Sequence, residues 1–247
     1  MMHTLRAEWT KALTLRSTRL ALAAALLVPP ILALASGLAF DGESVAARSF
    51  PVESHGFETA GFGQPLMILF AALVTGAEYV DGQLRTTLAA IPGRGRVLAA
   101  KFTVIAVVGV LVGIVATSAA VLVKHAALGE RGLPFGGLTV GMVWNVVGVS
   151  VNYAMIGLIA GAITVLARTF VVALVVMVPL VLGLTISLLA VVPAVKFLPD
   201  LAGLQLLTSY PGVGLLDPIP GGAVMAAWTL LLVAASWLVF RSRDAAR

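Results

Sequence analysis

Residues 102–123 read FTVIAVVGVLVGIVATSAAVLV, a run of 22 residues without a charged side chain, bounded by Lys101 and Lys124. A helix of about 20 apolar residues crosses the roughly 30 Å hydrocarbon core of a bilayer. The run does not alternate between apolar and polar residues, as a strand of a membrane β-barrel would. It therefore predicts a membrane-spanning helix.

Five further stretches have the same character. None of the six contains Asp, Lys or Arg, and their one acid, Glu78, lies at the end of the second. Together they cover 133 of the 247 residues. The expected spans are residues 20–40, 62–79, 102–123, 139–166, 169–192 and 221–240.

The composition supports an all-α polytopic membrane protein, with a single transmembrane domain over residues 1–247. Hydrophobic residues make up 60% of the chain and charged residues 11%, whereas an ordinary soluble domain has about 25% charged residues. A soluble enzyme and a disordered chain are therefore excluded. With zero cysteines and three scattered histidines, we expect no metal site.

The charged residues between the spans predict the orientation. Twelve Lys and Arg residues fall on the side of the N-terminus and four on the other side, whereas the acids divide four against seven. Loops rich in Lys and Arg stay in the cytoplasm. We therefore expect six spans with both termini in the cytoplasm.

Residues 4–19 have the pattern of a helix that lies in the membrane surface. Leu5, Trp9 and Leu13 recur every four residues and form one apolar stripe. Cationic side chains on the other faces would approach anionic lipid. The simpler alternative is a basic flank that only orients the first span. The residues predicted to act in the interfacial helix are Trp9, Lys11 and Arg16.

The loop after the second span, residues 80–101, contains a possible short helix. Residues 81–90 can form about two turns, and Ile91-Pro92-Gly93 would end them. Leu84, Leu88 and Ile91 give this segment an apolar face on which a partner could dock. A solvated loop with four orienting charges is the alternative.

Two segments are expected on the outer side. Residues 193–220 carry only three charged residues and are too apolar for a free loop. A helix that starts at Pro199-Asp200 and ends at Pro211-Gly212 is expected to dip into the outer leaflet or to cap a cavity. Residues 41–61 contain four acids and are expected to be solvated.

Polar and small residues inside the spans predict helix contacts. Asn152 lies near the middle of the fourth span, where an interhelical hydrogen bond is favoured over a contact to substrate. Gly109 with Gly113, and Gly157 with Gly161, have the G-x-x-x-G spacing that allows helices to approach closely. This spacing does not by itself identify a dimer face.

The chain lacks the residues for its own energy supply. It has no G-x-x-x-x-G-K-[ST] sequence, and none of its lysines follows a glycine, so it has no phosphate-binding P-loop. Ionisable residues of the kind that drive ion-coupled transporters are missing from the spans. Ser150 has no histidine nearby in sequence for nucleophilic catalysis. Catalytic residues are therefore not expected.

Two stretches resemble the permease subunits of bacterial ABC transporters of the type 2 class. They are RAEWTKALTLRSTRLAL at residues 6–22 and TGAEYVDGQLRTTLAAIPGRGRVLAAK at residues 75–101. One departure is Ala77, because the family more often has glycine directly before the glutamate. The matching residues are Glu8, Trp9, Thr10, Lys11, Glu78, Tyr79, Gly82, Arg85, Thr86, Thr87 and Leu88.

The resemblance implies an N-terminal connecting helix, a coupling helix after span two and outer helices between spans five and six. It also implies two ABC ATPase subunits, a second permease subunit that is identical or different, and a place in the bacterial cell membrane. ATP and Mg would bind to the ATPase, and this chain would bind no cofactor and no nucleic acid. The residues expected to couple to the ATPase are Glu78, Asp81, Gln83, Leu84, Arg85, Thr86, Thr87 and Leu88.

In the resembling family, spans two and five line the translocation pathway. An exporter of an amphipathic or hydrophobic cargo, such as a drug, a peptide antibiotic or a lipid-like molecule, is the favoured function. Import, a role in immunity or sensing, a stand-alone ion-coupled carrier and a scaffold without transport are the alternatives. The candidate pathway residues are Met67, Phe70, Thr75, Met177, Thr185 and Ser187.

Overall fold

The computed structural model describes residues 2–40, 51–79, 93–208 and 214–242. It is 86% helical, and the described residues form no strand. Six helical segments in this part of the chain are long and apolar enough to cross a membrane. The predicted fold class, an all-α membrane protein with six spans, is confirmed.

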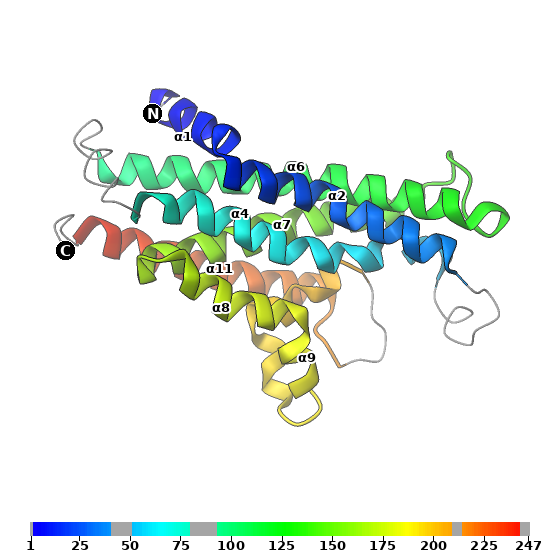
Figure 1. Cartoon of the computed structure of the whole chain (residues 1–247). Helices are drawn as coiled ribbons and strands as arrows, with labels where there is room; N and C mark the ends of the chain where they lie inside the picture. Colours follow the sequence, from blue (N-terminus) through cyan, green and yellow to red (C-terminus); the bar gives the residue numbers. More distant parts are fainter. Residues whose placement is uncertain (1, 41–50, 80–92, 209–213, 243–247) are drawn as a thin grey trace.

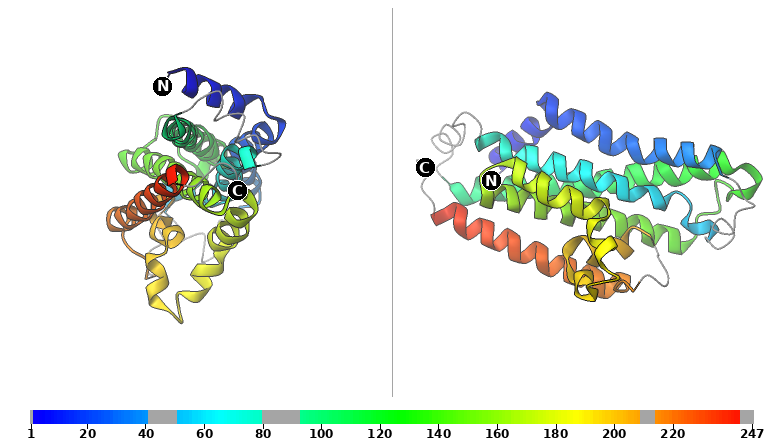
Figure 2. Two further views of the ribbon diagram at one scale, coloured as in Figure 1. Left: turned by 90° about the vertical axis from the view of Figure 1, so that its left-hand side faces the viewer. Right: turned by 60° about the horizontal axis from the view of Figure 1, so that its bottom comes forward.

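The spanning helices run roughly parallel to one long axis, and the N-terminal helix α1 (Met2–Thr14) lies at one end of the bundle (Figure 1). Helix α7 occupies the centre, because it packs against α4, α6, α8 and α11. The end-on view of Figure 2 places α1 on one side and the segment around residue 190 on the opposite side. The main helices of the six segments are α2 (Arg16–Leu38), α4 (Gln64–Gly76), α6 (Arg94–Leu128), α7 (Val140–Ala167), α8 (Phe170–Pro179) and α11 (Pro218–Ser242).

The glycines of α6 allow its close packing against α7. A Cβ atom on Gly113 would lie 2.5 Å from the Cα atom of Ser150, and one on Gly109 would lie 2.8 Å from the Cα atom of Ala154. Gly157 of α7 faces the side chain of Ile105 in turn. The predicted close approach is confirmed, and it occurs between two helices of the same chain.

The N-terminal segment differs from the predicted single helix over residues 4–19. Leu15 has an extended conformation (φ −66°, ψ 133°) and separates α1 from α2. Arg16 is therefore the first residue of a spanning helix and not part of the surface helix. Helix α6 is also longer than the expected span, because it continues beyond both ends of residues 102–123.

The expectation of a solvated loop over residues 41–61 is wrong for residues 54–60, most of which are buried; residues 51–53 are exposed, and residues 41–50 lie outside the described part. Two 3-10 helices, η1 (Val52–Ser54) and η2 (Phe57–Gly63), fold back onto the bundle. Phe57 is fully buried, and Ala60 accepts a 2.6 Å hydrogen bond at its carbonyl oxygen from the Tyr153 hydroxyl. Glu58 can lie in this largely buried segment because its carboxylate pairs with the ammonium group of Lys124 at 3.0 Å.

The fifth span is broken, in contrast to the predicted uninterrupted span over residues 169–192. Helix α8 passes into a π-helical turn, η5 (Leu180–Leu184), in which Gly183 has φ 117°. A short helix, α9 (Thr185–Leu188), then leaves in a new direction (Figure 1). Gly183 permits this bend because glycine has no Cβ atom to clash at positive φ.

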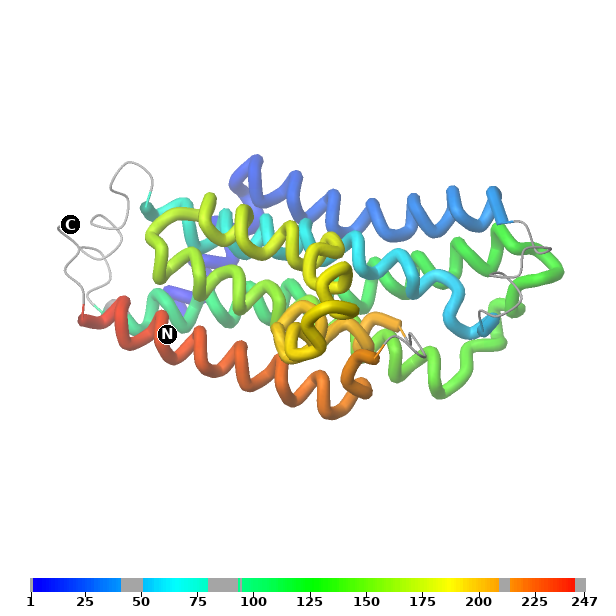
Figure 3. The backbone as a smooth tube through the Cα atoms, turned by 90° about the horizontal axis from the view of Figure 1, so that it is seen from below, coloured from blue at the N-terminus to red at the C-terminus, as the bar shows by residue number. Residues whose placement is uncertain are grey.

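The segment that follows consists of short turns on one side of the bundle (Figure 3). They are η6 (Pro193–Phe197), α10 (Pro199–Ala202) and η7 (Leu204–Leu206). A helix begins at Pro199 as predicted, but it ends after one turn; Pro211-Gly212 lies outside the described residues.

Asn152 of α7 accepts a 2.9 Å hydrogen bond from Gln64 of α4 and donates one of 2.9 Å to the carbonyl of Gly203. The predicted interhelical hydrogen bond of Asn152 is confirmed.

Candidate functional site

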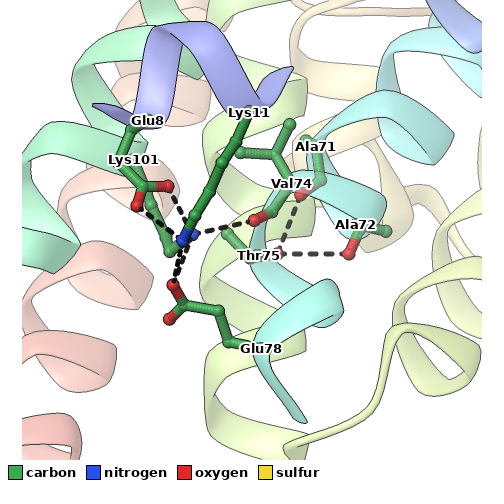
Figure 4. A network of polar contacts seen from close by, with 8 residues as sticks. All are labelled: Glu8, Lys11, Ala71, Ala72, Val74, Thr75, Glu78 and Lys101. Atoms are coloured by element: carbon green, nitrogen blue, oxygen red, sulfur yellow. Dashed lines mark hydrogen bonds and ion pairs between the residues drawn. The ribbon is translucent and has the colours of Figure 1, made fainter. Parts of the chain in front are cut away.

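Four charged side chains meet where α1 packs against the bundle, and we call them the ion cluster: Glu8, Lys11, Glu78 and Lys101 (Figure 4). Glu8 and Lys11 come from α1, and Lys101 comes from the first part of α6. Glu78 belongs to the 3-10 turn η3 (Ala77–Tyr79) that follows α4. The ion cluster therefore joins three elements that are far apart in sequence.

Lys101 is the central cation of the ion cluster. Its Nζ atom lies 2.6 Å from Glu8 Oε2 and 3.2 Å from Glu78 Oε1, and it donates a 3.1 Å hydrogen bond to the carbonyl of Val74. Glu8, Glu78 and Lys101 are all buried. Three good acceptors around a buried ammonium group offset much of the free energy that its removal from water costs.

Lys11 closes the ion cluster from its exposed side. Its Nζ atom lies 3.3 Å from Glu8 Oε1 and 3.3 Å from Glu78 Oε1, and 46% of the side chain is exposed. Partial burial alone would lower the pKa of Lys11, but the two carboxylates outweigh it and raise the pKa above its ordinary value. Two ammonium groups thus balance two carboxylates, and the ion cluster has no net charge.

Two of the predicted site residues, Glu78 and Lys11, come together in this arrangement. Glu8 and Lys101 complete it, although the sequence patterns do not single them out as site residues. The four-residue spacing of Thr4, Glu8 and Ala12, which form the buried face of α1, is the sequence feature that could have indicated that Glu8 faces the bundle. Leu5 and Trp9 of the predicted apolar stripe are half-buried against the core, and Leu13 is exposed.

Of the eight predicted coupling residues, only Glu78 belongs to the described part of the chain. Arg16 is exposed at the start of α2. Tyr79 is the last described residue before the predicted coupling segment, so the ion cluster adjoins that segment in sequence. The residues that lie outside the described part of the chain are Asp81, Gln83, Leu84, Arg85, Thr86, Thr87 and Leu88.

The candidate pathway residues occupy different environments. Met67, Phe70, Thr75 and Met177 are buried within the bundle, whereas Ser187 is exposed. The hydroxyl group of Thr75 donates a 2.8 Å hydrogen bond to the carbonyl of Ala71 in its own helix.

The sixth candidate, Thr185, lies on a pocket of about 300 Å³ between α4, η5 and α10. Asp200 also lines this pocket. No group of three or more His, Cys, Asp or Glu side chains that could hold a metal ion occurs in the described ranges.

Comparison with known proteins gives the family. A search among curated proteins returned no match for this chain. The model of the family described as "ABC-2 family transporter protein" matches residues 4–196, which is most of the chain and includes the ion cluster. The chain therefore belongs to the ABC-2 transporter family, whose members are multi-pass membrane permease subunits that associate with an ABC ATPase.

Proposed function

We propose that the chain is the membrane-spanning half of an ATP-driven exporter, which it forms with a second permease subunit and two ATPase subunits. Family membership supports the permease role. The chain has no P-loop sequence of its own, which agrees with ATP and Mg being bound by the partner. The ATPases would bind on the cytoplasmic side, where the excess of Lys and Arg predicts both termini of the chain.

The observation that carries the proposal is the ion cluster. Its member Glu78 lies three residues before Asp81, at which the predicted coupling segment 81–93 begins. Ion pairs connect Glu78 to Lys101 of α6 and to Lys11 of α1. A push on the coupling segment would therefore move α1, α6 and the end of α4 together, because buried polar networks hold their partners rigidly.

The cargo class follows from the lining that the spans can offer. Residues 62–77 of the second span and 169–192 of the fifth contain no charged side chain, so a pathway between these two spans suits an amphipathic or hydrophobic molecule. Movement of α4 and α8 would expose Met67, Phe70, Thr75 and Met177, which are buried in the single chain. We assign these four residues, with Thr185 and Ser187, to the pathway in the working transporter.

Dependence on an ATPase tests the proposed function directly. Arg85→Glu and Thr87→Pro are expected to reduce co-purification of the ATPase and ATP-dependent transport at least tenfold, because the first reverses a charge and the second would break the predicted coupling helix. Arg131→Glu, at the opposite end of the bundle, is the matched control and should change neither quantity. Transport by the isolated chain on a proton gradient, with no ATPase present, would contradict the proposal.

The orientation has its own test, which the absence of cysteine in the natural sequence makes simple. A cysteine introduced as Ser44→Cys should react with a membrane-impermeant maleimide in intact cells. One introduced as Ser242→Cys, at the end of α11, should react only after the cells are permeabilised. The reverse labelling pattern would place the ion cluster outside the cell.

A further inference from the structure

The pocket that contains Asp200 is mostly apolar but is lined by two acidic residues. It lies at the N-terminal end of α4, away from the ion cluster, and its volume is about 300 Å³. Its walls include Leu180, Ile186, Leu201 and Leu204, and no Lys, Arg or His of the described chain lines it. The acids Glu58 and Asp200 both line it.

Asp200 is buried in the pocket wall with one oxygen free. Only 3% of the residue is exposed. Its Oδ2 atom accepts a hydrogen bond from the Thr185 hydroxyl, whereas Oδ1 has no hydrogen-bond partner among the described residues. Burial raises the pKa of Asp200, and hydrogen bonds from the Thr185 hydroxyl and from the backbone N–H groups of Asp200 and Leu201 act in the opposite direction. A buried polar atom without a partner is uncommon and costs free energy until a donor reaches it.

Glu58, the other acid of the pocket, is already satisfied. Its Oε1 atom lies 3.0 Å from the ammonium group of Lys124, and its Oε2 atom accepts a 2.5 Å hydrogen bond from the backbone N–H of Gly56. Glu58 and Lys124 therefore balance each other. Asp200 is therefore the acid of the pocket for which the described residues supply no cationic partner.

We propose that this pocket binds a monocationic amphiphile, whose ammonium group donates a hydrogen bond to Asp200 Oδ1 and whose apolar part lies against Leu201 and Leu204. The inference rests on the proposed transport function and gives the chemical class of its cargo. A single free carboxylate oxygen in apolar walls suits one ammonium group, whereas Ca²⁺ and Mg²⁺ need about six oxygen ligands.

Binding can be measured on the full chain in lipid nanodiscs without any ATPase. By isothermal titration calorimetry, corrected with empty nanodiscs, 2-phenylethylammonium should bind tighter than the neutral 2-phenylethanol. Asp200→Asn should weaken the binding of the amine about tenfold to hundredfold, because a hydrogen bond to a charged group is lost. It should leave the binding of 2-phenylethanol unchanged.

Two further variants keep the test decisive. Asp217→Asn removes an exposed acid outside the pocket and should leave the affinity for the amine unchanged. Leu204→Trp should abolish binding of the amine by filling the pocket while Asp200 stays in place. Equal affinity for amine and alcohol, or unchanged amine binding in Asp200→Asn or Leu204→Trp, would overturn the inference. Because no ATPase is present, binding of the amine is independent of whether an ATPase associates with the chain.

Discussion

Replacement of Lys101 by methionine is expected to lower the free energy of unfolding by about 3–5 kcal/mol, the range seen when one partner of a buried ion pair is removed. The variant leaves Glu8 and Glu78 buried with only Lys11 to balance them. Methionine fills a similar volume, so the loss reports the charge and not a cavity. Reversible denaturant unfolding in mixed micelles measures the effect.

Lys11→Met is the matched control, because it removes the same charge from the same ion cluster at its exposed side. Its expected loss is below about 1 kcal/mol, since a solvated ion pair contributes little. The double variant Glu8→Gln with Lys101→Met restores neutrality and should be no less stable than Lys101→Met alone. A larger loss in the control than in Lys101→Met would contradict the assigned role of Lys101.

Replacement of Gly113 by alanine is expected to lower the free energy of unfolding by about 1–3 kcal/mol, because overpacking moves two tightly packed helices apart. The added Cβ atom would lie 2.5 Å from the Cα atom of Ser150 and 2.9 Å from its hydroxyl oxygen. Backbone atoms of α7 cannot rotate away as a flexible side chain can. The same unfolding titration measures the change.

Gly141→Ala is the control for the helix propensity of alanine. An added Cβ atom at Gly141 of α7 has ordinary contacts, the nearest at 3.6 Å. This variant should gain stability, by up to about 1 kcal/mol, because alanine favours the helix. Equal effects of the two variants would show that α6 and α7 are not in close contact at Gly113.

The sequence predicts the number and order of the spans because the cost of burying polar groups in hydrocarbon adds up over about 20 residues. A break inside a span depends on one or two residues, so no comparable free-energy cost adds up along the sequence to predict it. Gly183 is one glycine in an apolar run, and only the structure shows that it takes φ 117° and bends the chain. Pro199 is predicted as a helix start, but the helix that begins there ends after one turn, at Gly203.

The ion cluster is the part of the site that composition and periodicity could not predict. Burial of Glu8 contradicts the usual preference of carboxylates for water, and it is compensated by Lys11 and, most closely, by Lys101, which lies 93 residues away in the sequence. Such pairs depend on tertiary contact, which one sequence does not reveal. The apolar stripe of α1 was predicted to face the membrane, but Leu5 and Trp9 pack partly against the core, beside the buried Glu8.

The bend at Gly183 has a consequence for the surrounding lipid. The 10 residues of α8 and the 5 of η5 rise only about 22 Å at 1.5 Å per residue, less than the roughly 30 Å of an average hydrocarbon layer. A short apolar wall is accommodated by local thinning of the bilayer. Acyl chains beside this face are therefore expected to be compressed, and the headgroups of that leaflet to be drawn inward toward η6, none of whose residues is buried.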